Sequence, residues 1–479
     1  LVQRMQEKGI KCKTSLLLFP IYLCVFISLI GCNTDKEADI PEFQPDTSDT
    51  TPGDISDKLV ARIYFDASVS MQGFVRPNST RYARLCLQLE RIIISSWQNG
   101  TVDFFQFGER VEPIDRNEHL NVVRPQFYEN ENIHRQTFIE KVIDHGTQLR
   151  AESRTLELTE PVVNNVPEEP ATLPAEEVRN NTEENPLGVI VTDLFQNRND
   201  MTLLVSRLKK QYIQQNLEVG ILGLRSEFDG FIYGIAETPQ RYRSISGNPD
   251  TFRPFYLLVL GKHADIAHYF NKLITSGFSE AKTVIFSRYL VSPLLSFDGA
   301  EIERLENLIR DAIVERPDSQ LKEYRIRARN KPSKISATMK YELLPHAMPF
   351  DSNIFEPTII VEHNRHNSDR RKEISRAAQN CLEVTSTFAK NGNGDELIVD
   401  FELDSRVLAR RTVYLYKAAL HPKIDTYQVP EWCSEWDMGT GRNGAKTLNL
   451  VNFVDSLTDI AVREHQPKIA QFYFYVEKR

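Results

Sequence analysis

The residues with the clearest chemistry lie in one short segment, Asp66-Ala67-Ser68-Val69-Ser70-Met71-Gln72-Gly73. The segment follows LVARIYF at residues 59–65, a run of β-branched and aromatic residues typical of a buried strand. A loop that leaves the end of this strand can turn the Asp66 carboxylate and the hydroxyls of Ser68 and Ser70 toward one point. Such hard oxygen ligands suit Mg2+ or Mn2+, so the segment predicts a divalent-cation site.

The pattern Asp-x-Ser-x-Ser-Met-x-Gly after a hydrophobic strand resembles the metal-ion-dependent adhesion site (MIDAS) of von Willebrand factor A (vWA) domains. The commonest form of that motif has Gly between the serines, where this chain has Val69, but the position supplies no ligand. The resemblance implies a second metal-site Asp, which we assign to Asp193 at the end of GVIVTD, residues 188–193. It also implies a Thr ligand between the two acids. Thr137 is our candidate, with Thr147 and Thr155 as rivals.

These residues also have interpretations without a metal. Asp, Ser and Thr commonly cap helices and turns, which would account for Asp66, Ser68 and Ser70. Thr137 precedes Phe138-Ile139-Glu140, and a Thr-x-x-Glu capping pattern alone would explain it. A comparison of Asp66 with the nucleophile of Asp-dependent phosphatases fails, because those enzymes need a second Asp where this chain has Ser68.

Hydrophobic periodicity around these residues alternates between strand and helix. The extended patterns lie at 59–65, 101–107, 188–193, 217–224 and 255–261, and the helical ones at 82–98, 201–215 and after His263. This order predicts an α/β domain over residues 59–278 with a doubly wound parallel sheet. An acidic, proline-containing stretch at about 151–186 is interpreted as an insertion, and residues 230–250 show no helical pattern.

Beyond residue 279, strand patterns dominate. They begin at Thr283, Tyr324, Ile335, Pro357, Leu382, Glu396, Thr412 and Gln471. Asn391-Gly392-Asn393-Gly394 predicts a β-hairpin between two of them, and helices are expected over 301–315 and 448–465. Residues 279–479 are therefore predicted to form a β-rich, sandwich-like α+β region.

A glycine-rich segment at residues 439–447 precedes the second of these helices. It contains Gly-x-Gly-x-x-Gly and ends in Lys446-Thr447. A Walker A loop requires Gly, Lys and Thr to be contiguous, but Ala445 separates Gly444 from Lys446. We interpret the segment as a loop that enters a helix.

The N-terminus has the features of a targeting signal. Lys8, Lys11 and Lys13 precede an apolar run at residues 16–29, which is shorter than the roughly 20 residues of a membrane span. The run ends in Leu29-Ile30-Gly31-Cys32, which resembles a bacterial lipobox. The resemblance implies that residues 1–31 are removed and that acylated Cys32 anchors the protein to a membrane. An N-terminal membrane anchor that contains a Cys is the alternative.

Residues 32–58 are acidic and contain Pro, Thr and Ser, which is typical of a flexible tether. Asn33 stands where an inner-membrane retention signal has Asp. We therefore expect a location in the bacterial cell envelope, at the outer membrane rather than the inner one, with the membrane face left open. In an oxidising compartment, Cys381 and Cys433 would be able to form a disulfide, which is a hypothesis.

The composition narrows the function. The 479 residues include 66 acidic and 58 basic ones, and the net charge of −8 argues against a nucleic-acid binder. The resemblance implies a non-enzymatic lipoprotein that holds a cation through Asp66, Ser68, Ser70, Thr137 and Asp193. A protein partner's Asp or Glu carboxylate would fill the open coordination position. The alternatives are an envelope scaffold with an unused metal site and a metal-dependent hydrolase, for which no general base or nucleophile pair is evident.

Overall fold

The structure is a computed structural model. It describes residues 51–129, 136–159, 186–195, 201–234, 237–305, 308–312, 322–326, 332–351, 354–365, 373–391, 394–410, 412–439 and 443–478. The predicted signal segment, Cys32 and most of the predicted tether lie outside these ranges, as does most of the predicted insertion. None of the helices in the described ranges is long and apolar enough to cross a membrane.

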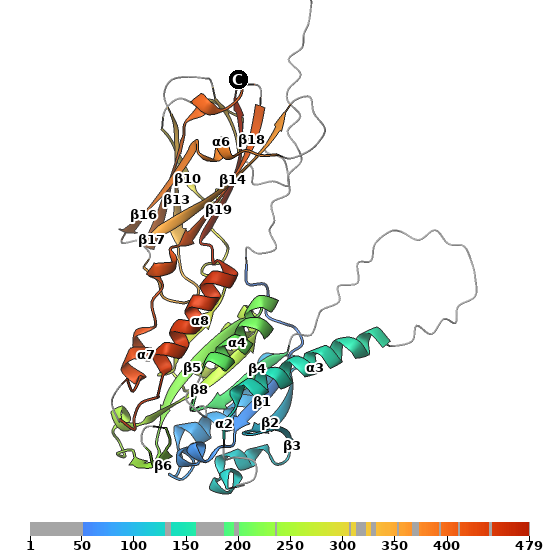
Figure 1. The fold of residues 1–479 in the computed structure, drawn as a ribbon, viewed down its shortest axis with the longest axis vertical. Coiled ribbons are helices and arrows are strands. Elements are labelled where there is room, and N and C mark those ends of the chain that lie inside the picture. The colour runs from blue at the N-terminus through green and yellow to red at the C-terminus, as the bar shows by residue number, and fades with distance from the viewer. Residues whose placement is uncertain are drawn as a thin grey trace, which may run out of the picture.

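The N-terminal part is built on a seven-stranded sheet (Figure 1). Its strands, in spatial order, are β3 (Val111–Ile114), β2 (Thr101–Phe107), β1 (Val60–Asp66), β4 (Leu187–Thr192), β8 (Arg253–Gly261), β5 (Glu218–Ser226) and β9 (Lys282–Phe286). β1 pairs in parallel with both β2 and β4. β3 is antiparallel to β2, β8 is antiparallel to β4 and β5, and β9 is antiparallel to β5. The α/β class is confirmed, but the sheet is mixed: the prediction of parallel pairing holds for β2, β1 and β4 and is wrong for the other pairs of neighbouring strands.

The reason is the connection between β5 and β8. A parallel neighbour requires a crossover, usually a helix, whereas a short excursion returns the chain antiparallel. Residues 229–243 form a small hairpin of β6 (Asp229–Ile232) and β7 (Gln240–Arg243), followed by a 3-10 helix at Pro249–Thr251. β8 therefore re-enters the sheet beside β5 in the opposite direction.

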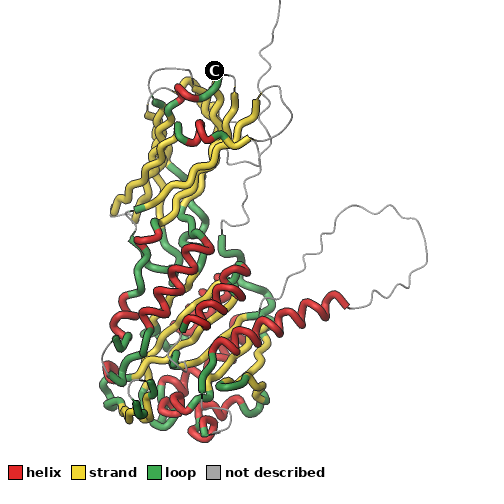
Figure 2. The backbone as a smooth tube through the Cα atoms, in the orientation of Figure 1, coloured by secondary structure: helices red, strands yellow, loops and turns green. Residues whose placement is uncertain are grey.

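Helices cover both faces of this sheet (Figures 1 and 2). On one face lie α2 (Arg81–Ser96) and α5 (His263–Thr275), which share a core with alternate residues of the strands. α2 buries Leu85, Leu89 and Ile93 at helical spacing, and its N-cap Thr80 accepts a hydrogen bond from the backbone N–H of Ala83. On the other face lie α3 (Ile139–Thr159), α4 (Thr202–Gln211), α7 (Glu431–Trp436) and α8 (Leu450–His465).

The position of α8 was not anticipated. The pattern at 448–465 correctly predicts a helix, but the expectation that this helix packs in the β-rich region is wrong. Instead, Phe453, Val454, Leu457 and Ala461 are fully buried in the core that also contains Ile190 of β4 and other residues of that sheet. The last helix of the chain therefore completes the first α/β unit.

The β-rich part contains two further sheets that pack on each other. One has the order β10 (Glu301–Leu305), β13 (Ser333–Tyr341), β17 (Gly394–Leu403), β16 (Leu382–Asn391). The other has the order β11 (Leu308–Ala312), β12 (Lys322–Ile326), β19 (Ala470–Lys478), β18 (Thr412–Pro422), β14 (Phe355–Arg365), β15 (Glu373–Ile374). Phe401 of β17 meets Phe472 of β19 with ring centroids 5.0 Å apart, and residues of both sheets form one core. This agrees with the sandwich-like prediction, although β12 and β19 are parallel.

Two local predictions in this part have opposite outcomes. The β16–β17 hairpin is confirmed, with Asn391 opposite Gly394. The helix at 301–315 was wrong, because its first residues form β10, which pairs with β13, and the next ones form β11, which pairs with β12. Strand pairing with distant segments here overrides a short helix-like apolar spacing.

Shorter elements complete the described chain. They are α6 (Arg376–Gln379) and 3-10 helices at Val69–Phe74, His119–Val123, Pro125–Tyr128, Ile213–Gln215, Ser405–Val407 and Ile424–Thr426.

The predicted disulfide is not formed. Cys86, Cys381 and Cys433 are free and buried. Cys381 packs in the core of the β-rich sheets, whereas Cys433 lies on α7 in the core beneath the α/β sheet. The two thiols belong to different hydrophobic cores, which explains why they do not pair.

Candidate metal centre

The parallel pairing of β1 and β4 brings the two predicted acids together. Phe65 lies opposite Val191, so both strands end at the same edge of the sheet. Asp66 ends β1, and Asp193 follows directly after β4. Both residues are at most 1% exposed. A pair of aligned strand ends therefore places two carboxylates in one buried region.

Asp66 is surrounded by donors from three segments. Its Oδ1 accepts hydrogen bonds from the backbone N–H of Ser68 at 3.0 Å and from the Thr137 hydroxyl at 3.4 Å. Its Oδ2 accepts a 2.8 Å hydrogen bond from the hydroxyl of Thr192, the last residue of β4. Thr192 was not predicted, although its position immediately before Asp193 was a usable signal.

The two serines lie together at the start of a 3-10 helix at Val69–Phe74. Their hydroxyl oxygens are 2.9 Å apart, and both residues are 5% exposed. Gly73, the last residue of the motif, packs against Phe228, where an added Cβ would lie only 2.3 Å from the ring. The glycine is therefore required by close packing beside the centre.

The structure also distinguishes among the threonines. Thr137 is 1% exposed and donates to Asp66, so it belongs to the centre. The Thr147 hydroxyl instead donates to the carbonyl of Ile143 and to Gln211. The side chain of Thr155 lies outside the described part. All five predicted site residues are thus brought into one region.

Burial and mutual repulsion govern the electrostatics. Burial is the main cause that raises the pKa of Asp66, and the neighbouring Asp193 carboxylate raises it further. Hydrogen bonds from Ser68 and Thr192 act in the opposite direction. Removing Asp66 from water and placing it beside a second carboxylate disfavours its charged form. A proton on Asp66 or a cation beside the pair would each relieve this cost.

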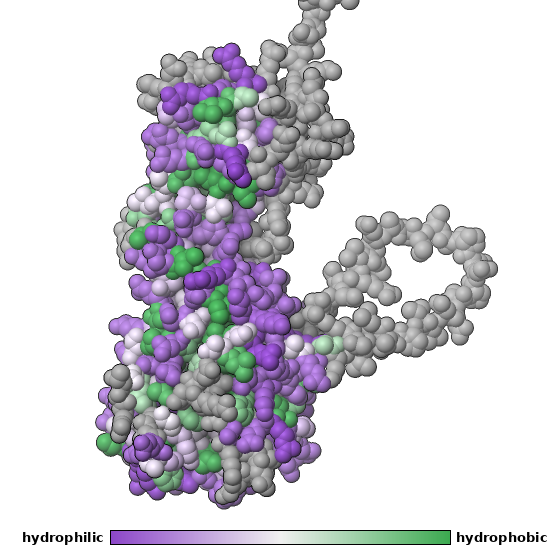
Figure 3. All heavy atoms as spheres, viewed as in Figure 1, coloured by the Kyte–Doolittle hydropathy of each residue, from purple (hydrophilic) through white to green (hydrophobic). Residues whose placement is uncertain are grey.

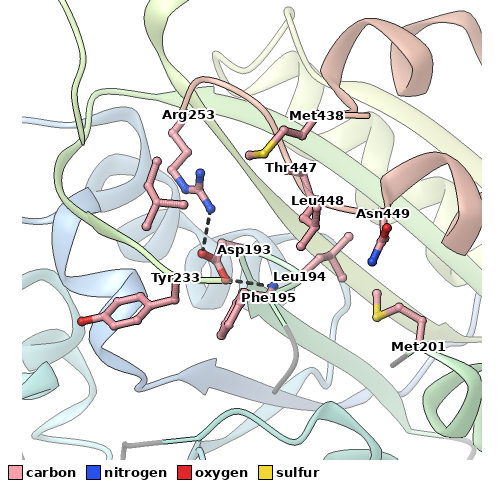
Figure 4. Close-up of a pocket in the computed structure, with 11 residues that line it drawn as sticks. Asp193, Leu194, Phe195, Met201, Tyr233, Arg253, Met438, Thr447, Leu448 and Asn449 are labelled. Atoms are coloured by element: carbon pink, nitrogen blue, oxygen red, sulfur yellow. Dashed lines mark hydrogen bonds and ion pairs between the residues drawn. The ribbon is translucent and has the colours of Figure 1, made fainter. Parts of the chain in front are cut away.

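Arg253 supplies one positive charge that the sequence did not reveal. Its Nη2 lies 3.3 Å from Oδ2 of Asp193, and both side chains are at most 5% exposed (Figure 4). The other carboxylate oxygen, Oδ1, accepts a hydrogen bond from the backbone N–H of Phe195. Arg253 reaches this edge because it begins β8, the antiparallel neighbour of β4. The expectation of a parallel strand there concealed this contact.

The C-terminal glycine-rich segment also reaches the centre. Nη1 of Arg253 donates to the carbonyl of Gly444 at 3.1 Å and to that of Lys446 at 3.3 Å. The hydroxyl of Tyr256 donates to that of Thr447 at 2.8 Å. Gly444 packs closely on Tyr242, where an added Cβ would lie 2.3 Å from the ring. Residues 443–447 of this segment form a loop before α8, as predicted, and they also close one side of the site.

The donor set suits a small hard cation. It consists of two carboxylates and four hydroxyls, those of Asp66, Asp193, Ser68, Ser70, Thr137 and Thr192. Within the described ranges, no group of three or more His, Cys, Asp or Glu side chains is placed to hold a metal, so hydroxyl ligands would be essential here. A cavity of about 10 Å³ next to Asp193 and Arg253 has room for roughly one water-sized group.

Comparison of the chain with protein-family models, with curated proteins and with solved structures gave no match. The assignment of this centre therefore depends on its own geometry and chemistry.

Proposed function

We propose that the protein is a vWA-like, membrane-anchored lipoprotein of the cell envelope that binds a protein partner through a divalent cation. The cation is Mg2+ or Mn2+, held by Asp66, Ser68, Ser70, Thr137 and Asp193 directly or through water. When bound, it supplies a positive centre for an Asp or Glu carboxylate of the partner. Residues 32–58 would serve as a tether between the lipid on Cys32 and the folded part.

One observation carries this proposal: oxygen atoms that can act as metal ligands meet around Asp66 from three segments that lie far apart in the sequence. Two carboxylates are buried side by side, and their repulsion disfavours a second negative charge unless a cation is present. The hydroxyls of Thr137 and Thr192 donate hydrogen bonds to Asp66, which places two further oxygen atoms beside its carboxylate. A set of capping residues would not require a second buried carboxylate.

The surface agrees with a polar mode of recognition. On the face shown in Figure 3, hydrophobic residues of the described part form separate groups among hydrophilic ones. A carboxylate on a cation is a directional contact that needs no broad apolar surface. The centre itself is buried, so a partner's side chain reaches it only when the covering segments move.

The Arg253–Asp193 ion pair favours a second candidate function, an envelope scaffold in which an internal cation takes the place of a metal. A guanidinium that already partners one of the carboxylates offsets part of the negative charge. This candidate predicts a thermal stability that does not respond to Mg2+ or Mn2+.

The two candidates are separated by the melting temperature of the full chain in chelator and in millimolar Mg2+ or Mn2+. A ligand that binds only the folded state at one hundred times its Kd stabilises that state by about 2.7 kcal/mol. We expect the metals to raise the melting temperature of the native protein. We expect the same rise in the control variant Asp298→Ala, which removes an exposed carboxylate. We expect Asp66→Ala to fold but to have the same melting temperature in chelator and in metal.

Partner binding is tested with the same variants. Proteins captured from envelope extracts are expected to be released by chelator, to be absent with Asp66→Ala and to be displaced by free glutarate. If neither metal changes the melting temperature of the native protein, the cation-dependent proposal is overturned and the scaffold function is the better one.

A further inference from the structure

The side chain of Arg253 connects the candidate metal centre with the C-terminal segment. It is 4% exposed, contacts Asp193 through Nη2 and holds the carbonyls of Gly444 and Lys446 through Nη1. Its guanidinium also lies 5.4 Å from the ring centroid of Phe228. Its Nε has no hydrogen-bond partner within the described part of the chain. One buried cation therefore touches both the site and the loop that enters α8.

The bonding of Asp193 leaves a cation little freedom of approach. Oδ1 accepts from a backbone N–H, which is fixed by the chain, and Oδ2 accepts from Arg253, whose side chain can change rotamer. A divalent ion that uses Asp193 would bring two positive charges close to the guanidinium. Like charges at such distances in a buried site repel strongly. The divalent ion and the Arg253 guanidinium would therefore compete for the Asp193 carboxylate.

The loop has other anchors that do not involve the centre. Thr447 accepts from the Tyr256 hydroxyl, and its backbone exchanges hydrogen bonds with Trp436 and Met438. Gly444 packs tightly against Tyr242. The carbonyls of Gly444 and Lys446 are the part of the loop that depends on Arg253. Movement of the guanidinium would therefore loosen residues 443–446, while the bonds of Thr447 keep α8 in place.

We propose that Arg253 is a built-in competitor of the divalent cation at Asp193, and that its release on cation binding loosens residues 443–446. The inference rests on the proposed cation site. Arg253 is a positioning residue in this scheme, since it acts on the ion through Asp193 and not as a ligand.

The test measures the affinity of the full chain for Mn2+ alone, by electron paramagnetic resonance of the free ion. Arg253→Met removes the competing charge and is expected to tighten binding by on the order of tenfold or more. Arg225→Met is the matched control, because the Arg225 guanidinium lies 5.0 Å from the ring centroid of Trp436 and forms no ion pair with Asp193 in the described part of the chain. This variant should bind Mn2+ like the native protein. Asp66→Ala is expected to abolish binding.

Hydrogen–deuterium exchange of the unaltered chain gives a readout that needs no variant. Mn2+ is expected to speed exchange at residues 443–446 and to leave α2 unchanged. Affinity in Arg253→Met equal to or weaker than native, with Asp66-dependent binding intact, would overturn the competition and leave the proposed function standing. Mn2+ binding that appears only in Arg253→Met would support the competition and reject the proposed function for the native chain. Absence of Asp66-dependent binding in both proteins would overturn both ideas.

Discussion

At the scale of single residues, burial decides which charge state a polar group retains. His263 begins α5 and is 3% exposed, with its Nδ1 2.9 Å from the hydroxyl of Ser287. Burial lowers the pKa of His263 to about 4, Glu218 acts against that shift, and His346 adds to it. The folded protein therefore holds a neutral imidazole under conditions in which an exposed one would be charged.

This shift predicts an acid sensitivity. As the pH falls below about 6.5, the unfolded chain binds a proton at His263 and the folded chain does not until about pH 4. The free energy of unfolding should therefore decrease across that window, by about 2 to 3 kcal/mol from this residue. His263→Asn cannot titrate at this position. The decrease in its free energy of unfolding between pH 7.5 and pH 4.5, measured with urea, should therefore be smaller than that of the native protein by about 2 to 3 kcal/mol. Equal losses in both proteins would show that His263 is not the cause.

Residue types and their spacing predicted the core of the candidate site but not its surroundings. Asp66, Ser68 and Ser70 could be predicted as site residues because they lie close together in the sequence and follow a recognisable strand. Asp193 and Thr137 required a family resemblance, since they lie far along the chain. The contact of Arg253 with Asp193 could not be predicted, because a single Arg at the start of a strand can be placed near the site only once the direction of that strand is known.

At the scale of elements, the type of each element follows from local periodicity and its partner does not. The helix at 448–465 was predicted within two residues of α8, yet its apolar face could equally cover any sheet. Similarly, β8 was predicted as a strand, but only the β6–β7 hairpin before it makes it antiparallel. Long-range packing, absent from any local window, determines both outcomes.

The role of α8 in the α/β core predicts a large effect of a single truncation. Leu457 is fully buried in that core, so Leu457→Ala should lower the free energy of unfolding by about 2 to 5 kcal/mol through lost contacts and a cavity. Leu87 of α2 is 47% exposed, and Leu87→Ala is the matched control, with a change within about 0.5 kcal/mol. Chemical denaturation of both full-length variants measures the difference. Similar values for the two would show that α8 contributes little to the core.

At the scale of the whole molecule, the described chain has separate hydrophobic cores at its two ends. Figure 1 shows the α/β part at one end, the β sheets at the other, and α8 running between them along the α/β sheet. The thiols follow this division, with Cys86 and Cys433 on opposite faces of the α/β sheet and Cys381 in the β-rich core.

This arrangement predicts the behaviour of the thiols toward an alkylating reagent. Cys86, Cys381 and Cys433 are buried, and burial raises the pKa of each thiol, so reactive thiolate is scarce. Without reductant, all three should resist iodoacetamide in the folded protein and react after denaturation. Peptide mass spectrometry provides the measurement. A linked Cys381–Cys433 peptide would contradict the placement of these residues in different cores.

The return of α8 to the first sheet also has a consequence for how the chain is made. β9 ends at Phe286, but α8, the last of the four helices on this face of the sheet, ends at His465. At typical synthesis rates of about 5 to 20 residues per second, this separation leaves the part of the face that α8 covers exposed for roughly 10 to 40 s on each nascent chain. During that interval, the apolar residues that α8 later covers are open to chaperones, and a chain whose synthesis stops before α8 leaves them exposed.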